Sequence, residues 1–179
     1  MRIFHFAFLF SLIYSQYNSS EWGSITSLLT PTGIKVVDDG TVYVSTAGGL
    51  LEFNPYMEQF NFIKTEEGLV YLDLATISSD NQGRLWMGCA YPQGCMQVYD
   101  PEIGLVGYFE DPSIVSINKI VIGENISFSV YQGTTSSDVG ILEFALDDDG
   151  LPEYQDYYNN FPYESITEIR DLDIVQDSV

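Results

Sequence analysis

Residues 40–55 read GTVYVSTAGGLLEFNP, and residues 83–101 carry a recognisable second copy of this stretch, GRLWMGCAYPQGCMQVYDP. In both copies a turn glycine leads into a short alternating strand, a tight turn follows, and a second strand ends at an aromatic residue before Asn-Pro or Asp-Pro. The pattern predicts the same β-hairpin twice. Gly40 and Gly83 lie 43 positions apart, within the period of roughly 40 to 50 residues at which four-stranded propeller blades repeat.

Alternating apolar residues and turn residues extend each hairpin into a unit of four strands. In the first unit we expect strands at residues 34–37, 42–45, 50–53 and 59–64. In the second unit we expect them at residues 72–77, 85–89, 95–99 and 107–110. A looser third unit has expected strands at residues 117–121, 126–131 and 140–144, with an insertion at 132–139. A fourth unit is expected to begin with a strand at residues 166–175.

The two copies also have aromatic and aliphatic residues at corresponding positions. The corresponding pairs in the first and second units are Tyr43 and Trp86, Leu50 and Met96, and Phe53 and Tyr99. In the third unit, GILEF at residues 140–144 mirrors GLLEF at residues 49–53.

These repeats predict an all-β fold: a partial β-propeller of about three four-stranded antiparallel blades plus the start of a fourth. The expected blades span residues 32–68, 69–111, 112–160 and, in part, 161–179. A propeller closes with about four to eight blades, so we expect a fragment of a longer protein, or completion by another segment, with the remaining blades as partner. Alone, the chain would expose strand edges and an apolar blade face. An open array that is complete in itself is the alternative.

The repeat resembles the two-component regulator propeller repeat, found in secreted and periplasmic β-propellers of bacteria, over residues 32–179. The shared pattern is an inner strand, a turn glycine, an aromatic residue, a small residue, Gly-Gly-Leu and a strand that ends at an aromatic residue. The family's usual Trp-Ile-Gly-Thr core is kept in part, as YVST at residues 43–46 and WMGC at residues 86–89. The resemblance implies the N-terminal part of a large secreted protein of the kind that carries a type IX secretion sorting tail.

The first 15 residues, MRIFHFAFLFSLIYS, have the features of a cleaved secretory signal peptide. Arg2 precedes an apolar run, and the small Ser15 stands just before the polar Gln16. The run is too short to cross a bilayer as a helix, so a retained anchor is the weaker alternative. We expect cleavage after Ser15, a lead-in segment over residues 16–31, and a location that is secreted, on the cell surface or in the periplasm.

The chain is strongly acidic, with 26 Asp and Glu against six Lys and Arg and a formal net charge of −20. Phosphate backbones and anionic membranes repel such a charge, so we expect neither nucleic acid nor, after signal cleavage, a membrane as partner. The single histidine, His5, lies in the predicted signal peptide. The exported chain would therefore lack an imidazole for a Ser-His-Asp triad, a Cys-His pair or a His-ligated zinc site.

The two cysteines, Cys89 and Cys95, stand at the ends of the hairpin loop AYPQG. An oxidising compartment favours a disulfide between them. Because the loop that it closes is short, the bond should contribute about 2 kcal/mol. Unlinked thiols are the alternative, whereas a redox-active pair is disfavoured because the spacing is not Cys-x-x-Cys.

Three further stretches contain side chains that could bind a ligand. Asp147-Asp148-Asp149-Gly150 offers oxygen ligands for calcium, but its aspartates lack the alternating spacing of calcium loops. We interpret it, and likewise Asp80-Asn81-Gln82-Gly83, as a solvated turn between strands. The stretch YQDYYNNFPY at residues 154–163 could form an aromatic platform for carbohydrate or peptide, although we interpret it as an outer strand and connector. We predict no catalytic, metal-binding or cofactor-binding residues.

The function expected from these observations is binding: a secreted or cell-surface interaction module for a protein or carbohydrate ligand, without catalytic activity of its own. Two alternatives stay open. One is the extracellular sensor domain of a two-component signalling protein, which the family resemblance implies. The other is a fragment of a propeller-type lyase or glycosidase, which would bring two carboxyl groups within about 10 Å of each other at one end of the channel.

Overall fold

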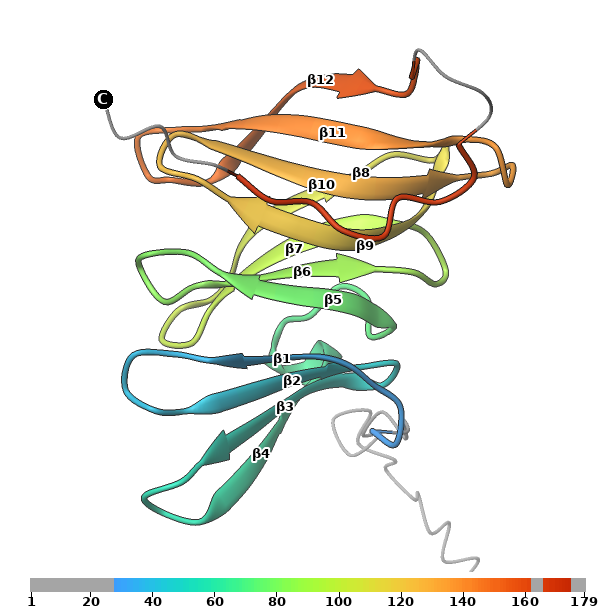
Figure 1. Ribbon diagram of the computed structural model, residues 1–179. Helices are drawn as coiled ribbons and strands as arrows, with labels where there is room; N and C mark the ends of the chain where they lie inside the picture. Colours follow the sequence, from blue (N-terminus) through green and yellow to red (C-terminus); the bar gives the residue numbers. More distant parts are fainter. Residues whose placement is uncertain (1–27, 162–165, 175–179) are drawn as a thin grey trace, which may run out of the picture.

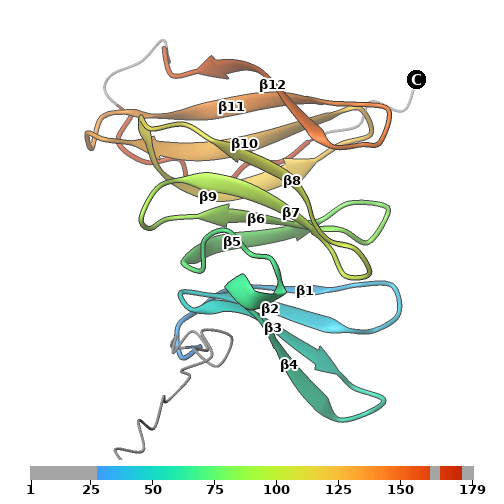
Figure 2. The ribbon, with the colours of Figure 1, turned by 180° about the vertical axis from the view of Figure 1, so that it is seen from behind.

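The computed structural model describes residues 28–161 and 166–174. In these ranges the chain forms three four-stranded antiparallel sheets, and each strand pairs with the next along the sequence. The sheets are stacked in chain order like blades (Figure 1, Figure 2). The predicted fold class, an all-β partial propeller, is confirmed. The predicted signal peptide and residues 16–27 of the predicted lead-in lie outside the described residues.

Turns of two to five residues join the strands inside each sheet; residues 64–73 connect the first sheet to the second, whereas only residues 111–113 connect the second to the third. The first sheet contains β1 (Pro31–Val36), β2 (Val42–Thr46), β3 (Gly49–Asn54) and β4 (Gln59–Ile63). The second contains β5 (Leu74–Ser79), β6 (Leu85–Cys89), β7 (Cys95–Asp100) and β8 (Gly104–Glu110). The third contains β9 (Ile114–Ile122), β10 (Ile126–Gly133), β11 (Val139–Leu146) and β12 (Pro152–Tyr158). A 3-10 turn, η2 (Thr65–Glu67), lies between the first two sheets.

The first and second sheets have the same pairing register, as expected for repeats. The equivalent pairs are Val42 with Phe53 and Leu85 with Tyr99, then Ser45 with Leu50 and Gly88 with Met96. A small residue therefore lies opposite the aliphatic one in both sheets. At Gly88 the reason is close packing, because a Cβ there would lie 2.2 Å from the carbonyl oxygen of Ile117 in the next sheet.

Two apolar cores hold the stack together, one between each pair of neighbouring sheets. Side chains of the first core include Tyr43, Leu50 and Ile63 from the first sheet and Leu85, Met87 and Tyr99 from the second. Side chains of the second core include Trp86, Met96 and Val98 from the second sheet and Ile117, Leu142 and Phe144 from the third. Each sheet thus buries apolar surface by stacking on its neighbour, as repeat architectures do.

The fourth unit differs from the expectation, because residues 166–174 form no strand. They run beside β9 (Figure 1), where Asp171 Oδ1 lies 2.7 Å from Lys119 Nζ. The first strands β1, β5 and β9 are neighbours in the stack, so this segment occupies the place of a further inner strand. It lacks a ladder because the described residues contain no second strand of this unit with which it could pair.

Some of the aspartates form hydrogen bonds in the turns between strands. The Oδ1 atom of Asp39, Asp100 and Asp147 accepts a hydrogen bond from the backbone N–H two residues later, at 2.8, 2.8 and 2.9 Å. Such Asx turns mimic a backbone turn and reverse the chain. The aspartates therefore shape hairpins as well as solvating the surface.

Two serine hydroxyls in β10, Ser127 Oγ and Ser129 Oγ, are buried and have no hydrogen-bond partner in the described residues. They pair across the ladder with Phe144 and Leu142, which belong to the core shared with the second sheet. We expect Ser127→Ala and Ser129→Ala each to raise the free energy of unfolding by about 1 kcal/mol, because an unpaired buried hydroxyl carries a desolvation cost.

Urea denaturation measures this gain, with Ser137→Ala in the exposed β10–β11 loop as the control that should change stability little. A clear loss of stability in both buried variants would contradict the prediction, since it would mean that these hydroxyls make favourable contacts.

Candidate functional site

An aromatic cavity of about 310 Å³, which we call the rim cavity, opens between the second and third sheets. It lies where β8 leads into β9, β10 turns into β11 and β12 ends, at the right-hand end of the strands in Figure 1. Its lining consists of four aromatic residues (Phe109, Tyr131, Tyr154, Tyr157), four polar ones (Asp111, Ser113, Asp138, Asn159) and two aliphatic ones (Ile114, Leu142). Apolar walls with a few convergent polar groups are typical of small-molecule sites.

The aromatic wall of the rim cavity is held by ring packing. The rings of Phe109 and Tyr154 are stacked, with centroids 5.6 Å apart and an interplanar angle of 14°. The fully buried Phe144 meets Phe109 edge to face at 5.0 Å and Tyr154 at 6.0 Å. Such ring contacts stabilise the wall beyond what burial of the rings contributes. The wall is therefore formed before any ligand binds.

A β-bulge decides which tyrosines reach the rim cavity. The register between β11 and β12 shifts at Glu143 and Phe144, so that Tyr154 pairs with Phe144 and Tyr157 pairs with Leu142. Both tyrosines therefore lie on the face that meets the second sheet, although residues three apart in a regular strand point to opposite faces.

Two glycines make room for the deeper polar groups. A Cβ at Gly140 would lie 2.6 Å from Cε1 of the Tyr131 ring, and a Cβ at Gly133 would lie 2.0 Å from Oδ2 of Asp138. Any larger residue would displace the ring or the carboxylate. The Tyr131 hydroxyl donates to Asp138 Oδ1 at 3.5 Å, which links the two groups.

Hydrogen bonds in the rim cavity favour the ionised form of one carboxylate, that of Asp111. Asp111 Oδ1 accepts hydrogen bonds from the Ser113 hydroxyl at 2.6 Å and from the Ser113 N–H at 2.8 Å. These two hydrogen bonds hold the pKa of Asp111 below its ordinary value, and the bond from the Ser113 hydroxyl has the larger effect. Burial, with the nearby charge of Asp138, raises the pKa of Tyr131, so its hydroxyl stays a neutral donor.

The sequence interpretation located this site only in part. Of the stretch 154–163, Tyr154, Tyr157 and Asn159 line the rim cavity, whereas Tyr158 lies on the other face of β12 and donates to Glu143. Residues 162–165 lie outside the described ranges. The interpretation as an outer strand is correct, yet the strand also contributes to a site. Asp111, Tyr131 and Asp138 were not expected there; the one available signal was the insertion at residues 132–139, which contains Asp138.

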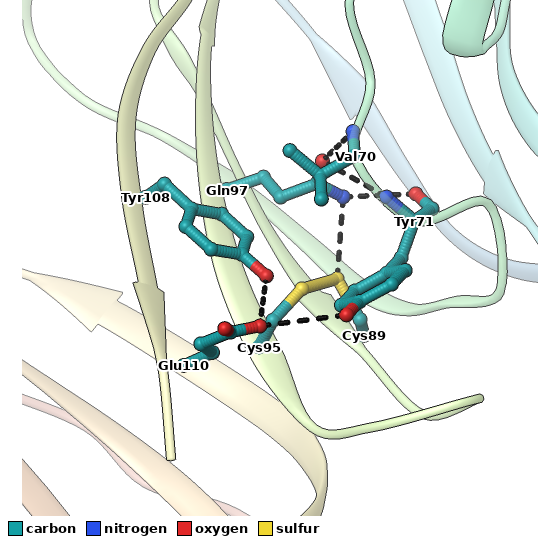
Figure 3. The surroundings of a disulfide bond; sticks show 7 residues. All are labelled: Val70, Tyr71, Cys89, Cys95, Gln97, Tyr108 and Glu110. Atoms are coloured by element: carbon teal, nitrogen blue, oxygen red, sulfur yellow. Dashed lines mark hydrogen bonds between the residues drawn. A yellow bond between two sulfur atoms is a disulfide. The ribbon is translucent and has the colours of Figure 1, made fainter. Parts of the chain in front are cut away.

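Cys89 and Cys95 are joined by a disulfide at the same end of the second sheet, with their Cα atoms 5.0 Å apart (Figure 3). The loop that it closes is tied to the third sheet, because Gly94 N–H donates to the carbonyl oxygen of Ile114 at 3.0 Å. Ile114 lines the rim cavity. The disulfide thus supports one wall of the site without facing the ligand space.

We expect reduction of the disulfide to lower the free energy of unfolding by about 2 kcal/mol, since a short loop restricts the unfolded chain only modestly. Urea denaturation with and without a strong reductant measures the difference. A variant with both cysteines replaced by alanine is the control, because its stability should not respond to reductant. An unchanged midpoint for the reduced wild type would contradict the expectation.

The two aspartate turns have structural partners that their interpretation as solvated turns missed. Asp80 is not solvated: its side chain is 3% exposed and its Oδ2 lies 2.6 Å from Arg84 Nε. Arg84 also donates to the carbonyl oxygens of Asp149 and Gly150 at 2.7 and 2.9 Å. The Asp147–Gly150 turn is therefore bound by an arginine. Within residues 28–161 and 166–174, no group of three or more His, Cys, Asp or Glu side chains is arranged to hold a metal ion.

A second, more polar hollow of about 500 Å³ lies along the inner strands. Its lining includes Lys35, Lys119, Asp171 and Asp173. The hydrogen bond from Lys119 is the main reason that the pKa of Asp171 lies below its ordinary value. This carboxylate is therefore an ion-pair partner rather than a proton donor.

In the part of the chain that the structure describes, no helix has the length and apolar character needed to span a bilayer. No family model matches the chain, and no curated protein matches it.

Among solved structures, the chain is similar to the extracellular domain of the hybrid two-component system protein BT3049 from B. thetaiotaomicron, with a TM-score of 0.53 and 18% sequence identity. The match covers 77% of this chain and 19% of that one, so the chain spans about a fifth of the neighbour's length. At this identity the likeness shows the fold alone. It agrees with the resemblance to two-component propellers at that level, without establishing the family.

Proposed function

We propose that the chain is a secreted or cell-surface β-propeller binding module that holds a ligand in the rim cavity and carries no catalytic activity of its own. The observation that supports this proposal most is the rim cavity itself, where a packed aromatic wall faces hydrogen-bonding groups. Rigid aromatic rings bind a ligand at low cost in conformational entropy.

Binding fits the charges better than acid-base chemistry does. A general acid needs a carboxyl group whose pKa is raised towards the working pH. In the two hollows described above, hydrogen bonds lower the pKa of Asp111 and of Asp171 instead. The chain's single histidine, His5, lies in the predicted signal peptide, far along the sequence from either hollow.

An extracellular or periplasmic location is supported by two observations. The disulfide between Cys89 and Cys95 is a feature of oxidising compartments. The solved neighbour is an extracellular domain. Export through the predicted signal peptide at residues 1–15 belongs to the same proposal.

The test is a ligand-observed NMR screen of soluble oligosaccharides and peptides against the full chain. We expect at least one compound to bind the wild type and to lose about tenfold or more in affinity with Tyr157→Ala, because a stacked ring contributes on the order of 1 kcal/mol or more. Tyr56→Ala is the matched control, since Tyr56 is 83% exposed and lies in the β3–β4 turn at the other end of the strands.

Two outcomes would overturn the proposal. In one, every bound compound binds Tyr157→Ala as tightly as the wild type. In the other, the compound is converted during incubation with the full chain, which would favour the lyase or glycosidase alternative.

We further propose that a β-sheet of the same repeat, as in the remaining blades of a propeller, covers the open face of the first sheet. Cross-strand partners share a face, and the registers place eight apolar residues on that face: Ile34, Val36, Val42, Val44, Leu51, Phe53, Phe60 and Phe62. Val42 and Phe53 are equivalent to Leu85 and Tyr99, which are buried against the first sheet. The open face of the first sheet therefore corresponds to the face of the second sheet that packs against the first.

Any such sheet would bury this face, including one from a second copy. We expect the chain to self-associate in sedimentation velocity, and Phe62→Lys to abolish the association, because Phe62 is 45% exposed there. Asn61→Lys is the control, because Asn61 precedes Phe62 in β4 and lies on the opposite face of the sheet, where it pairs with Glu52. A wild-type chain that stays monomeric at all concentrations would contradict the proposal.

The second candidate function is sensing, which the name of the solved neighbour favours. In that role, occupation of the rim cavity would alter a signalling region elsewhere in the protein. The genomic reading frame is the test: an adjoining membrane span and kinase region would favour sensing, whereas further blades followed by a sorting tail would favour the secreted module.

A further inference from the structure

We propose that the rim cavity selects a ligand with a positively charged nitrogen, namely an alkylammonium group. This inference rests on the proposed function, because it specifies the chemistry of the ligand that the rim cavity would bind.

The rim cavity contains two carboxylates and no positive charge to balance them. Asp111 and Asp138 are part of the lining, which includes no Lys or Arg. The ion pairs found in the described ranges involve other acids, Asp80, Glu168 and Asp171. Both cavity carboxylates therefore depend on water, on hydroxyl groups and on backbone N–H groups for their solvation.

A ligand that enters the rim cavity displaces part of that water. A neutral ligand, including a sugar, could donate hydrogen bonds but would leave both negative charges uncompensated in a drier environment, which is costly. An anion would add repulsion. An alkylammonium group lowers the cost, because its positive charge compensates one of the two negative charges, and the net charge of −20 attracts it from a distance.

The aromatic lining suits the same group. The faces of tyrosine and phenylalanine rings attract cations through their quadrupole, by about 0.5 to 2 kcal/mol. Four aromatic residues, Phe109, Tyr131, Tyr154 and Tyr157, line this hollow, with Phe109 and Tyr154 covering one face of each other. Rings and carboxylates together favour a nitrogen whose substituents are apolar.

The carboxylates are held in place before binding. Ser113 fixes Asp111 through two hydrogen bonds to Oδ1, while Asp138 packs closely on Gly133 and makes a longer contact of 3.5 Å with the Tyr131 hydroxyl. A ligand therefore does not have to order these side chains, and more of the attraction appears as affinity.

The experiment compares choline with 3,3-dimethylbutan-1-ol, its uncharged carbon isostere, by NMR titration of the full chain; n-butylammonium is a second cationic probe. We expect the two cations to bind in the millimolar range and the isostere to bind roughly tenfold more weakly or not at all, since tenfold corresponds to 1.4 kcal/mol. We also expect the affinity for choline to fall as salt is raised.

Charge removal within the rim cavity gives the second readout. Asp138→Asn and Asp111→Asn keep the shape of the side chain, and asparagine can still form an Asx turn at position 111. Each should weaken choline binding by about tenfold. Asp148→Asn changes the net charge equally, but Asp148 is exposed in the turn at the other end of the third sheet, so binding should not change.

The outcomes separate this inference from the proposed function. If the isostere or a neutral sugar binds as tightly as choline, or if both asparagine variants bind choline like the wild type, the inference is overturned while the rim cavity stays a binding site. If no probe binds and the screen of oligosaccharides and peptides also finds none, both fail.

Discussion

Replacing Arg84 with methionine is expected to lower the free energy of unfolding by about 3 to 5 kcal/mol, because it leaves a buried carboxylate without its partner. The side chains of Arg84 and Asp80 are only 7% and 3% exposed, and Nε and Oδ2 lie 2.6 Å apart. Asp80 also accepts a hydrogen bond from Trp86 Nε1 at 3.0 Å. Methionine fills similar space, so the loss would report the polar contacts more than the packing.

The same arginine joins two repeat units. Its Nη1 and Nη2 atoms donate to the carbonyl oxygens of Asp149 and Gly150, which lie in the turn between β11 and β12. At Gly150 the backbone has a positive φ of 72°, and a Cβ there would lie 2.8 Å from Nη2 of Arg84. Loss of Arg84 therefore removes the hydrogen bonds that hold the turn between β11 and β12 in the third sheet. It also leaves the Asp80 carboxylate in the second sheet without its ion-pair partner.

Arg170→Met is the matched control for this prediction. Arg170 pairs with Glu168 at 2.9 Å, yet these side chains are 84% and 59% exposed. Exposed pairs contribute at most about 1 kcal/mol. Chemical denaturation of both variants measures the difference, and equal losses for Arg84→Met and Arg170→Met would show that burial does not strengthen the contacts of Arg84.

Replacing Gln97 with leucine is expected to lower the free energy of unfolding by about 3 kcal/mol. Gln97 is fully buried in β7. Its Oε1 atom accepts hydrogen bonds from the N–H groups of Val70 and Tyr71 at 2.6 and 3.3 Å, and its Nε2 atom donates to the Tyr71 carbonyl at 2.9 Å (Figure 3). Leucine would leave these partly buried backbone groups unpaired, at a cost of up to about 1 to 3 kcal/mol each before relaxation.

Gln155→Leu is the control for Gln97→Leu, because Gln155 is an exposed glutamine in an outer strand. We expect it to change stability by less than about 0.5 kcal/mol. Hydrogen exchange gives a second readout: the amides of Val70 and Tyr71 should lose protection in Gln97→Leu before the rest of the second sheet does. Unchanged protection of both amides would contradict the assigned role.

The repeat made the fold predictable from the sequence. Turn glycines and alternating apolar residues recur with the period of a four-stranded unit, and local chemistry of this kind is enough to define hairpins. Equivalences such as Leu50 with Met96 hold in the pairing registers. The expected strand over residues 166–175 is the exception, because a strand needs a partner that the local sequence does not supply.

The candidate site was less predictable. The tyrosines of β12 could be recognised as an aromatic cluster, but the bulge that brings Tyr154 and Tyr157 to one face follows from pairing with β11. Asp111 and Asp138 come from different loops and looked like ordinary surface acids. Their common place in the rim cavity depends on how the second and third sheets are stacked.

The sequence by itself determined the all-β class, the order of the hairpins and the place of Cys89 and Cys95 at the ends of one loop, because each of these follows from residues close together along the chain. Only the tertiary structure decided which acids are buried, as Asp80 is, and which side chains meet in the rim cavity. The physical reason is that burial and convergence arise when separate sheets pack against each other, over distances along the chain that no local pattern records.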